Sequence, residues 1–219
     1  MIKAITAALL LSLSMTAFAQ PSPEEIAEWR AAAGQGEAWA QSNLGQMYDR
    51  GDGVPQDSAV AMKWWTKAAE QGYAKAQYNL ALMYADGEGV PKDNATAVKW
   101  YTKAAEQGYA DAQLNLGLMY DNGLGVPQDD ATAVKWYTKA AEQGVASAQE
   151  NLAFMYAKGE GVPQDNVMAY MWWNLAAAQG DENAKENKGK LQDSMTSAQI
   201  EEAQTLSREC LAKDYKHCG

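Results

Sequence analysis

Two cysteines and the only histidine lie together near the end of the sequence: Cys210, His217 and Cys218. Thiolates and imidazoles bind metals and carry redox chemistry, but these three side chains are too few for a structural zinc site, and no Cys-x-x-Cys pair is present. A straight helix would hold residues eight positions apart about 12 Å from each other, too far for a disulfide. The chain must therefore turn between the two cysteines if they pair.

Four aspartates could serve as acids or bases, but their spacing argues for another role. Asp57, Asp93, Asp129 and Asp165 recur once every 36 residues, whereas paired catalytic carboxylates would break such a symmetry. An N-cap carboxylate at the start of a helix explains the recurrence. The stretch 86–89 contains the acidic and glycine residues of a calcium loop without its alternating ligands or closing glutamate.

No other motif predicts catalysis. The sequence lacks a G-x-S-x-G elbow, a phosphate loop, a dinucleotide fingerprint and H-E-x-x-H. We therefore expect no enzymatic activity, no metal and no cofactor. The eight tryptophans could form a platform for stacking a ligand. Because four of them share one helical position, we expect these four to fill the core between helical layers: Trp64, Trp100, Trp136 and Trp172.

An internal repeat must position all of these residues. The repeated units are 33–68, 69–104, 105–140 and 141–176, and the second and third differ at only 8 of 36 positions. Within a unit, apolar and small residues spaced three and four apart predict a first helix that ends at Gly51. Pro55 marks the gap, and Asp57 begins a second helix. The sequence thus predicts an all-α solenoid of helix–turn–helix units.

Residues outside the units predict an export signal and two caps. Lys3, an apolar stretch and Ala17-Phe18-Ala19 are typical of a signal peptide over 1–19 that is cleaved after Ala19, and we expect a periplasmic or secreted protein without membrane insertion. Segment 20–32 contains a capping box at Ser22 that begins a short helix reaching about Ala33. Segment 181–219 is expected to be a degenerate capping repeat, with Lys188 where the units have leucine and a last helix from Thr196 to about Leu211.

The charge is strongly acidic, with 28 acidic against 18 basic side chains and a net charge of −10. Removal of Lys3 with the signal peptide makes the charge one unit more negative. Such a surface disfavours nucleic acid and anionic membranes and favours a basic partner, although solubility alone would also explain it.

Partner binding should use positions that differ between units, because positions that stay constant serve the stack. On the first helices the differing positions form a stripe with large apolar residues. We expect Trp39, Tyr78 and Leu114 to be exposed there, whereas three others either face a partner or pack between units: Leu82, Leu118 and Phe154. Aromatic residues of this kind are typical anchors of protein interfaces.

The pattern Leu-x-x-Met-Tyr-x-x-Gly-x-Gly-Val-Pro-x-Asp, followed by the segment 97–108, closely resembles the Sel-1-like repeat (SLR) family, a branch of the tetratricopeptide-like solenoids. The resemblance covers 33–180. It implies right-handed superhelical stacking, a concave face lined by the first helices, and a role in protein–protein assembly. It also implies a Cys210–Cys218 disulfide that clips the end of one helix to the start of the next, since pairing is usual in exported proteins.

The leading hypothesis is therefore an exported, monomeric adaptor or inhibitor that binds another protein on its concave face. The resemblance adds a specific version, an immunity protein that neutralises a toxin acting in the periplasm. The alternative is a cysteine-rich SLR enzyme that binds or hydrolyses β-lactams, for which the S-x-x-K motif and its partner motifs are missing as a set. A third possibility is a structural module of an envelope assembly.

Overall fold

The computed structural model describes residues 21–218, and every regular element in that range is an α-helix. The predicted signal peptide, 1–19 with cleavage after Ala19, lies outside the described residues. No helix in the described range has the length and apolarity needed to cross a membrane. The helices are α1 (Pro23–Gly34), α2 (Ala38–Arg50), α3 (Ser58–Glu70), α4 (Ala74–Asp86), α5 (Asn94–Glu106), α6 (Ala110–Asp121), α7 (Asp130–Ala141), α8 (Ala146–Lys158), α9 (Asn166–Ala178), α10 (Glu182–Gln192) and α11 (Ser197–Ala212).

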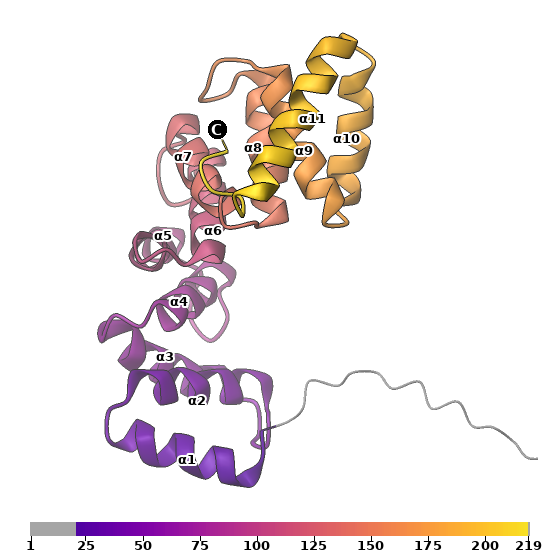
Figure 1. Cartoon of the computed structure of the whole chain (residues 1–219). Coiled ribbons are helices and arrows are strands. Elements are labelled where there is room, and N and C mark those ends of the chain that lie inside the picture. Colours follow the sequence, from indigo (N-terminus) through magenta and orange to yellow (C-terminus); the bar gives the residue numbers. More distant parts are fainter. Residues whose placement is uncertain (1–20, 219) are drawn as a thin grey trace, which may run out of the picture.

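The helices form a stack of antiparallel pairs. Helix α2 pairs with α3, α4 with α5, α6 with α7 and α8 with α9, and each second helix also packs against the first helix of the next pair. The stack bends, so that α5 and α7 lie on its outer side while α6 and α8 lie nearer to the inner side (Figure 1). The predicted all-α solenoid is confirmed.

The ends of the helices follow from local sequence. The carboxylates of Asp57, Asp93 and Asp129 each accept a backbone N–H bond of 3.0 Å three residues later, which confirms them as N-caps. Gly51 ends α2 in the left-handed conformation, with φ 76°. The second glycine of the loop serves close packing as well, because a Cβ at Gly125 would overlap the backbone of Asn94 in the preceding unit.

The core lies between the two helical layers and contains many alanines, which let helices approach closely. Its aromatic member is the second of the two adjacent aromatics in each unit. These four side chains are at most 5% exposed: Trp65, Tyr101, Tyr137 and Trp173. The prediction that the first aromatic fills the core holds for Trp136 and Trp172, which are buried. It is wrong for Trp64 and Trp100, which are half-buried, because their helix positions turn toward the outer surface.

Buried glutamines link successive units. The side-chain amide of Gln77 donates to the backbone carbonyl of Ala69 at 3.1 Å, and its carbonyl oxygen accepts a bond of 2.7 Å from Gln107. The same pair of bonds surrounds Gln41, Gln113 and Gln149. Because each glutamine joins the end of one second helix to the end of the following one, the series fixes the spacing of neighbouring units.

Helix α1 covers the first unit. It begins with the predicted capping box, in which Ser22 Oγ accepts from the Glu25 N–H at 3.1 Å and the Ser22 N–H donates to Glu25 Oε2 at 2.7 Å. Ile26 and Trp29 pack against the core residues of α2. The predicted N-terminal helix is confirmed.

The other end of the stack departs from the repeat. Helix α10 packs on α9 as each first helix packs on the preceding second helix, but α11 also packs on α9. The hydroxyl of Ser207 on α11 contacts the carbonyl oxygen of Met171 at 3.4 Å. Lys188, on α10, donates to Asn174 at 2.9 Å. Thus α11 folds back over the last unit.

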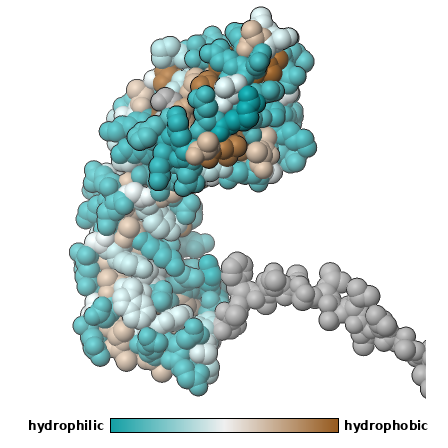
Figure 2. Space-filling view, in the orientation of Figure 1, coloured by the Kyte–Doolittle hydropathy of each residue, from teal (hydrophilic) through white to brown (hydrophobic). Residues whose placement is uncertain are grey.

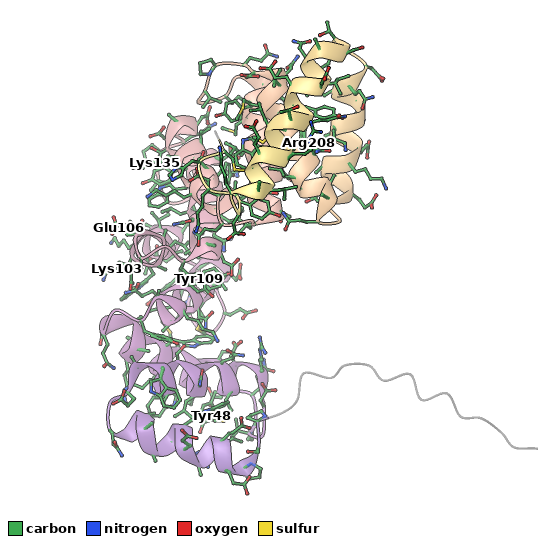
Figure 3. All side chains as sticks on the ribbon, in the orientation of Figure 1. Tyr48, Lys103, Glu106, Tyr109, Lys135 and Arg208 are labelled. Atoms are coloured by element: carbon green, nitrogen blue, oxygen red, sulfur yellow. A yellow bond between two sulfur atoms is a disulfide. The ribbon has the colours of Figure 1, made fainter. Side chains whose placement is uncertain are left out.

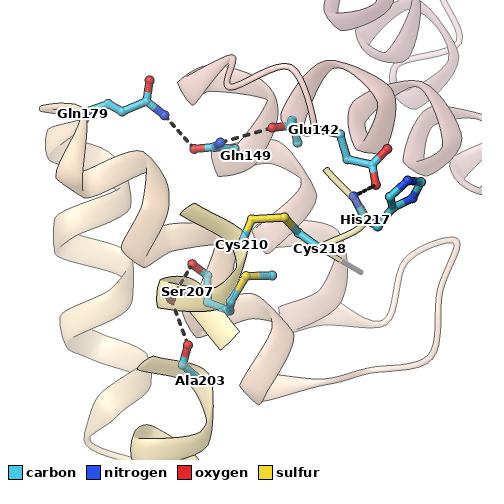
Figure 4. Close-up of a disulfide and its surroundings, with 10 residues drawn as sticks. Glu142, Gln149, Gln179, Ala203, Ser207, Cys210, His217 and Cys218 are labelled. Atoms are coloured by element: carbon cyan, nitrogen blue, oxygen red, sulfur yellow. Dashed lines mark hydrogen bonds between the residues drawn. A yellow bond between two sulfur atoms is a disulfide. The ribbon is translucent and has the colours of Figure 1, made fainter. Parts of the chain in front are cut away.

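The disulfide Cys210–Cys218 is present, with the two Cα atoms 5.1 Å apart (Figure 4). The expectation that Cys218 begins another helix is wrong, because the chain turns after α11 through residues with positive φ: Asp214, Tyr215 and His217. The exposed His217 donates its backbone N–H to Glu142 Oε1 at 3.1 Å. The disulfide therefore links a terminal turn to α11, and the hydrogen bond of His217 connects this turn to the end of α7.

Candidate functional site

Two of the six predicted partner-binding residues are well exposed. Trp39 on α2 is 37% exposed, and Phe154 on α8 is 41% exposed. The ammonium group of Lys158 lies 4.6 Å from the centre of the Phe154 ring, close enough for a cation–π contact. Both residues lie on first helices, at opposite ends of the stack. Phe154 faces solvent, and the alternative that it packs between units does not hold.

The other four residues are half-buried, which corrects the expectation that Tyr78 and Leu114 are exposed. The ring of Tyr78 lies 5.9 Å from Tyr101 and 5.0 Å from Tyr109, so part of it serves the stack. Leu82 packs against the same cluster, and Leu114 and Leu118 pack against the C-terminal core. These residues are half-buried because their side of each first helix is turned toward the following helix. At the corresponding position of α2, Ser42 is completely buried.

A groove lies where α2 meets α4, and we call it the inner groove. It has a volume of about 410 Å³. Tyr109 is one of its lining residues, and Figure 3 shows it on the side of the stack away from Lys103. The residues that line it are Gln46, Asp49, Arg50, Trp65, Lys75, Tyr78, Asn79, Leu82, Met83, Asp86, Glu88 and Tyr109.

Side chains from consecutive units hold the inner groove together. Lys75 on α4 donates a hydrogen bond of 2.9 Å to Gln46 on α2. The rings of Tyr78 and Tyr109, whose centres lie 5.0 Å apart at an interplanar angle of 38°, join α4 to the start of α6. The Trp65 indole, which donates to the carbonyl of Ser42 at 3.1 Å, forms part of the wall. The groove exists only in the assembled stack, because three units contribute to it.

The groove combines carboxylates, which we call its rim, with two tyrosines. The rim consists of Asp49, Asp86 and Glu88, and the tyrosines are Tyr78 and Tyr109. Partial burial, together with the nearby charge of Glu88, raises the pKa of Asp49 above its ordinary value. Burial also raises the pKa of Tyr78 and Tyr109, and the Asp111 carboxylate adds to both shifts. The two phenols therefore stay neutral at physiological pH and can donate hydrogen bonds. Arg50 and Lys75 line the groove as well, so its charged side chains are three carboxylates and two cations. The excess of one carboxylate favours a cationic side chain of a partner.

Sequence reasoning located the groove only in part. Tyr78 and Leu82 line it, whereas Trp39, Leu114, Leu118 and Phe154 lie elsewhere on the stack. The acidic residues Asp86 and Glu88 and the tyrosine Tyr109 were missed. A signal existed for Tyr109, because the residue before the first helix is tyrosine in the second and third units but not in the first and fourth. Over the range 21–218, no cluster of three histidine, cysteine or acidic side chains is arranged to hold a metal ion.

Comparison with known proteins identifies the family. The Sel1 repeat model matches residues 40–73, 74–109, 110–145 and 146–181, and the chain therefore belongs to the Sel1 repeat family. The matched segments begin a few residues after the units read from the sequence and correspond more closely to whole helix pairs. None of the curated proteins compared matches this chain.

Solved structures agree with the family. A Sel1 repeat protein from Oxalobacter formigenes is 36% identical, with a TM-score of 0.72 over 76% of this chain and 69% of that one. A protective antigen of uropathogenic Escherichia coli with an SLR fold is 30% identical, with a TM-score of 0.57 over 91% of this chain. The present chain spans about half of that antigen, 51%. Proteins of this family are generally scaffolds for protein–protein interaction.

Proposed function

We propose that this protein is an exported, monomeric scaffold that binds a partner protein along the first-helix face, with the inner groove as its central contact. The observation that carries the proposal is the groove itself, about 410 Å³ in volume and lined by side chains of consecutive units. Aromatic side chains in a partly desolvated hollow are typical binding anchors. The exposed rings of Trp39 and Phe154 extend the same face toward both ends of the stack.

The charge of the groove narrows the class of partner. Asp49, Asp86 and Glu88 surround it, and the whole chain carries a net charge of −10. We therefore propose that the partner inserts a lysine or arginine beside the Tyr78 ring, where a cation meets these carboxylates and an aromatic face. Long-range attraction between a basic partner and the acidic chain would speed their encounter.

Photocrosslinking in the native host tests this proposal. A photoreactive amino acid replaces Asn79, which lines the groove, and a matched variant carries it at Glu186 on the exposed face of α10. We expect one extracytoplasmic protein to crosslink through position 79 and not through position 186. Equal labelling at both positions would contradict the proposal.

The captured partner then provides a quantitative test and separates the specific roles. Leu82→Asp should weaken its binding by roughly 30-fold or more, as for the loss of an interface anchor. Leu211→Asp, at an exposed leucine on α11, should leave binding unchanged. Growth protection against a partner that is toxic in the periplasm would establish an immunity protein. A permanent complex with an envelope protein would establish a structural module.

A further inference from the structure

A stripe of lysines crosses the outer side of the stack, opposite the inner groove. Each of α3, α5 and α7 carries two exposed lysines around a tryptophan, and Figure 3 shows Lys103 and Lys135 projecting from this side. We call this surface the outer stripe. Its lysines are Lys63, Lys67, Lys99, Lys103, Lys135 and Lys139.

The charge of the outer stripe is unbalanced. It holds six of the 18 basic residues of a chain that is acidic as a whole. Within the described range the two ion pairs both lie in α10, Lys185 with Glu182 and Lys190 with Glu186. None of the six lysines therefore forms an ion pair there, although the charge of Lys99 helps to lower the pKa of Asp93. Figure 2 shows that hydrophilic residues dominate the visible face outside the C-terminal part.

Apolar hollows accompany these lysines. One of about 440 Å³ lies beside Val60, Met62 and Trp64, and one of about 430 Å³ lies beside Val98 and Trp100 in the next unit. The ammonium groups of Lys67 and Lys103 lie 4.5 and 4.2 Å from the centres of the Trp64 and Trp100 rings. In a single unit, the packing of an aliphatic lysine side chain over a tryptophan ring would by itself explain why the two residues lie together.

The fourth unit shows what occupies this surface when it is covered. Its second helix, α9, has Met171 and Leu175 where the earlier units have the two lysines, and both are buried, as is Trp172. Helix α9 packs against α8 and α10 as α5 packs against α4 and α6, and it packs against α11 in addition. Thus α11 covers the outer face of α9 as an amphipathic helix, with Ala203 and Cys210 buried and Glu201, Glu202 and Glu209 exposed.

We propose that the outer stripe of the first three units binds an amphipathic, acidic helix of another protein. The apolar side chains of that helix enter the hollows beside Trp64 and Trp100, and its carboxylates pair with the lysines. Covering by α11 goes with the replacement of both lysines by apolar residues, whereas the first two units, whose Trp64 and Trp100 are only half-buried, keep their positive charge. The stripe therefore fits a partner that brings negative charge, and it forms a second binding surface independent of the inner groove.

A designed peptide tests this proposal on the mature protein. The probe is a labelled helical peptide of about 20 residues, with leucines on one face and glutamates beside them. Its counterpart carries lysines in place of the glutamates. We expect the acidic peptide to bind, with NMR shifts confined to α3, α5 and α7, and the basic peptide not to bind. Absence of binding, equal binding of both peptides, or shifts elsewhere would overturn the proposal.

Variants of the stripe complete the experiment. Replacing Lys63, Lys67, Lys99 and Lys103 by Gln should weaken the acidic peptide at least about tenfold, and added salt should do the same. The charge-matched control replaces Lys185, Lys190, Lys213 and Lys216 by Gln and should change little. Leu82→Asp in the inner groove should also leave the peptide affinity unchanged. A single-stranded oligonucleotide that binds as well as the peptide would overturn the assignment of a protein partner.

Discussion

The side-chain amide of Gln143 donates a hydrogen bond of 2.7 Å to the carbonyl oxygen of Gln113, whose own amide donates to the carbonyl of Ala105 at 3.0 Å. Gln113 is buried, whereas Gln143 is exposed. We expect Gln113→Leu to lower the free energy of unfolding by about 1–3 kcal/mol, because it removes both of these hydrogen bonds from a buried junction. Gln143→Ala should cost about 0.5–1.5 kcal/mol. Urea unfolding followed by circular dichroism measures both, and equal losses would contradict this account.

A second prediction concerns glycines within first helices. A Cβ at Gly45 would lie 2.5 Å from the Trp65 ring, and one at Gly117 would lie 2.6 Å from the Tyr137 ring. In a helix, alanine is more favourable than glycine by about 1 kcal/mol. We nevertheless expect Gly45→Ala to lower the melting temperature, because overpacking the core costs about 1–3 kcal/mol. Ala81, at the matching position of the second unit, is the control. There Ala81→Gly should destabilise, since the native core already accommodates the methyl group.

The two adjacent tryptophans of α3 should respond differently to truncation. Trp65 is buried and donates to the Ser42 carbonyl, so Trp65→Ala should cost about 3–5 kcal/mol of unfolding free energy. Trp64 is half-buried beneath Lys67, and Trp64→Ala should cost no more than about 2 kcal/mol. Thermal and urea unfolding of the two variants give the comparison. A larger loss for Trp64 would reverse the assignment of the core aromatic.

The disulfide should stabilise the C-terminal end of the stack alone. Closing the short loop between Cys210 and Cys218 is worth about 2–3 kcal/mol in the chain-entropy model. We expect Cys218→Ala to increase hydrogen exchange in the terminal turn and the end of α11, while α2 to α6 stay protected. Glu142→Ala, which removes the acceptor of the His217 N–H, should have a weaker effect at the same place. Two free thiols in the unreduced, denatured protein would contradict the pairing.

The raised pKa of Asp49 predicts a pH dependence. A carboxyl whose pKa is higher in the folded state than in the unfolded chain stabilises the fold when protonated, and this contribution is lost as the pH rises through the folded pKa. Burial is the main cause, and Glu88 adds to it. Asp49→Asn should therefore increase the unfolding free energy near pH 7 and leave it unchanged near pH 3. Glu88→Gln should have a smaller effect in the same direction.

The repeat and its helix ends could be predicted from the sequence because they depend on near neighbours in the chain. The carboxylate of Asp57 caps a helix that begins at the next residue, and Gly51 ends the helix before it. The capping box at Ser22 is equally local and forms as predicted, and Thr196 begins the last helix as predicted. Four-fold recurrence of the unit then determined the stacking, because each unit can bury its apolar face only against another.

The remaining features depend on distances that periodicity does not encode. Trp64 and Trp65 are adjacent, and the helical periodicity alone cannot decide which of two neighbouring aromatic residues faces the core. Trp64 was therefore wrongly assigned to the core. The rim of the inner groove joins Asp49 to Glu88 across two units. Helix α11 was expected only as the last helix of a degenerate capping repeat. The structure shows that it packs on α9, where the buried Met171 and Leu175 replace the lysines of the earlier units.

The cover formed by α11 restricts the addition of repeat units to internal positions of the stack. A further unit cannot be added after α9 and α10 without displacing α11, and α1 closes the opposite end in the same way. Between these ends, every junction repeats the same glutamine bonds and the same loop packing, so a duplicated 36-residue segment inserted at an internal junction meets surfaces it already matches. The reach of the molecule can thus change in whole steps during evolution or engineering, while both ends stay as they are.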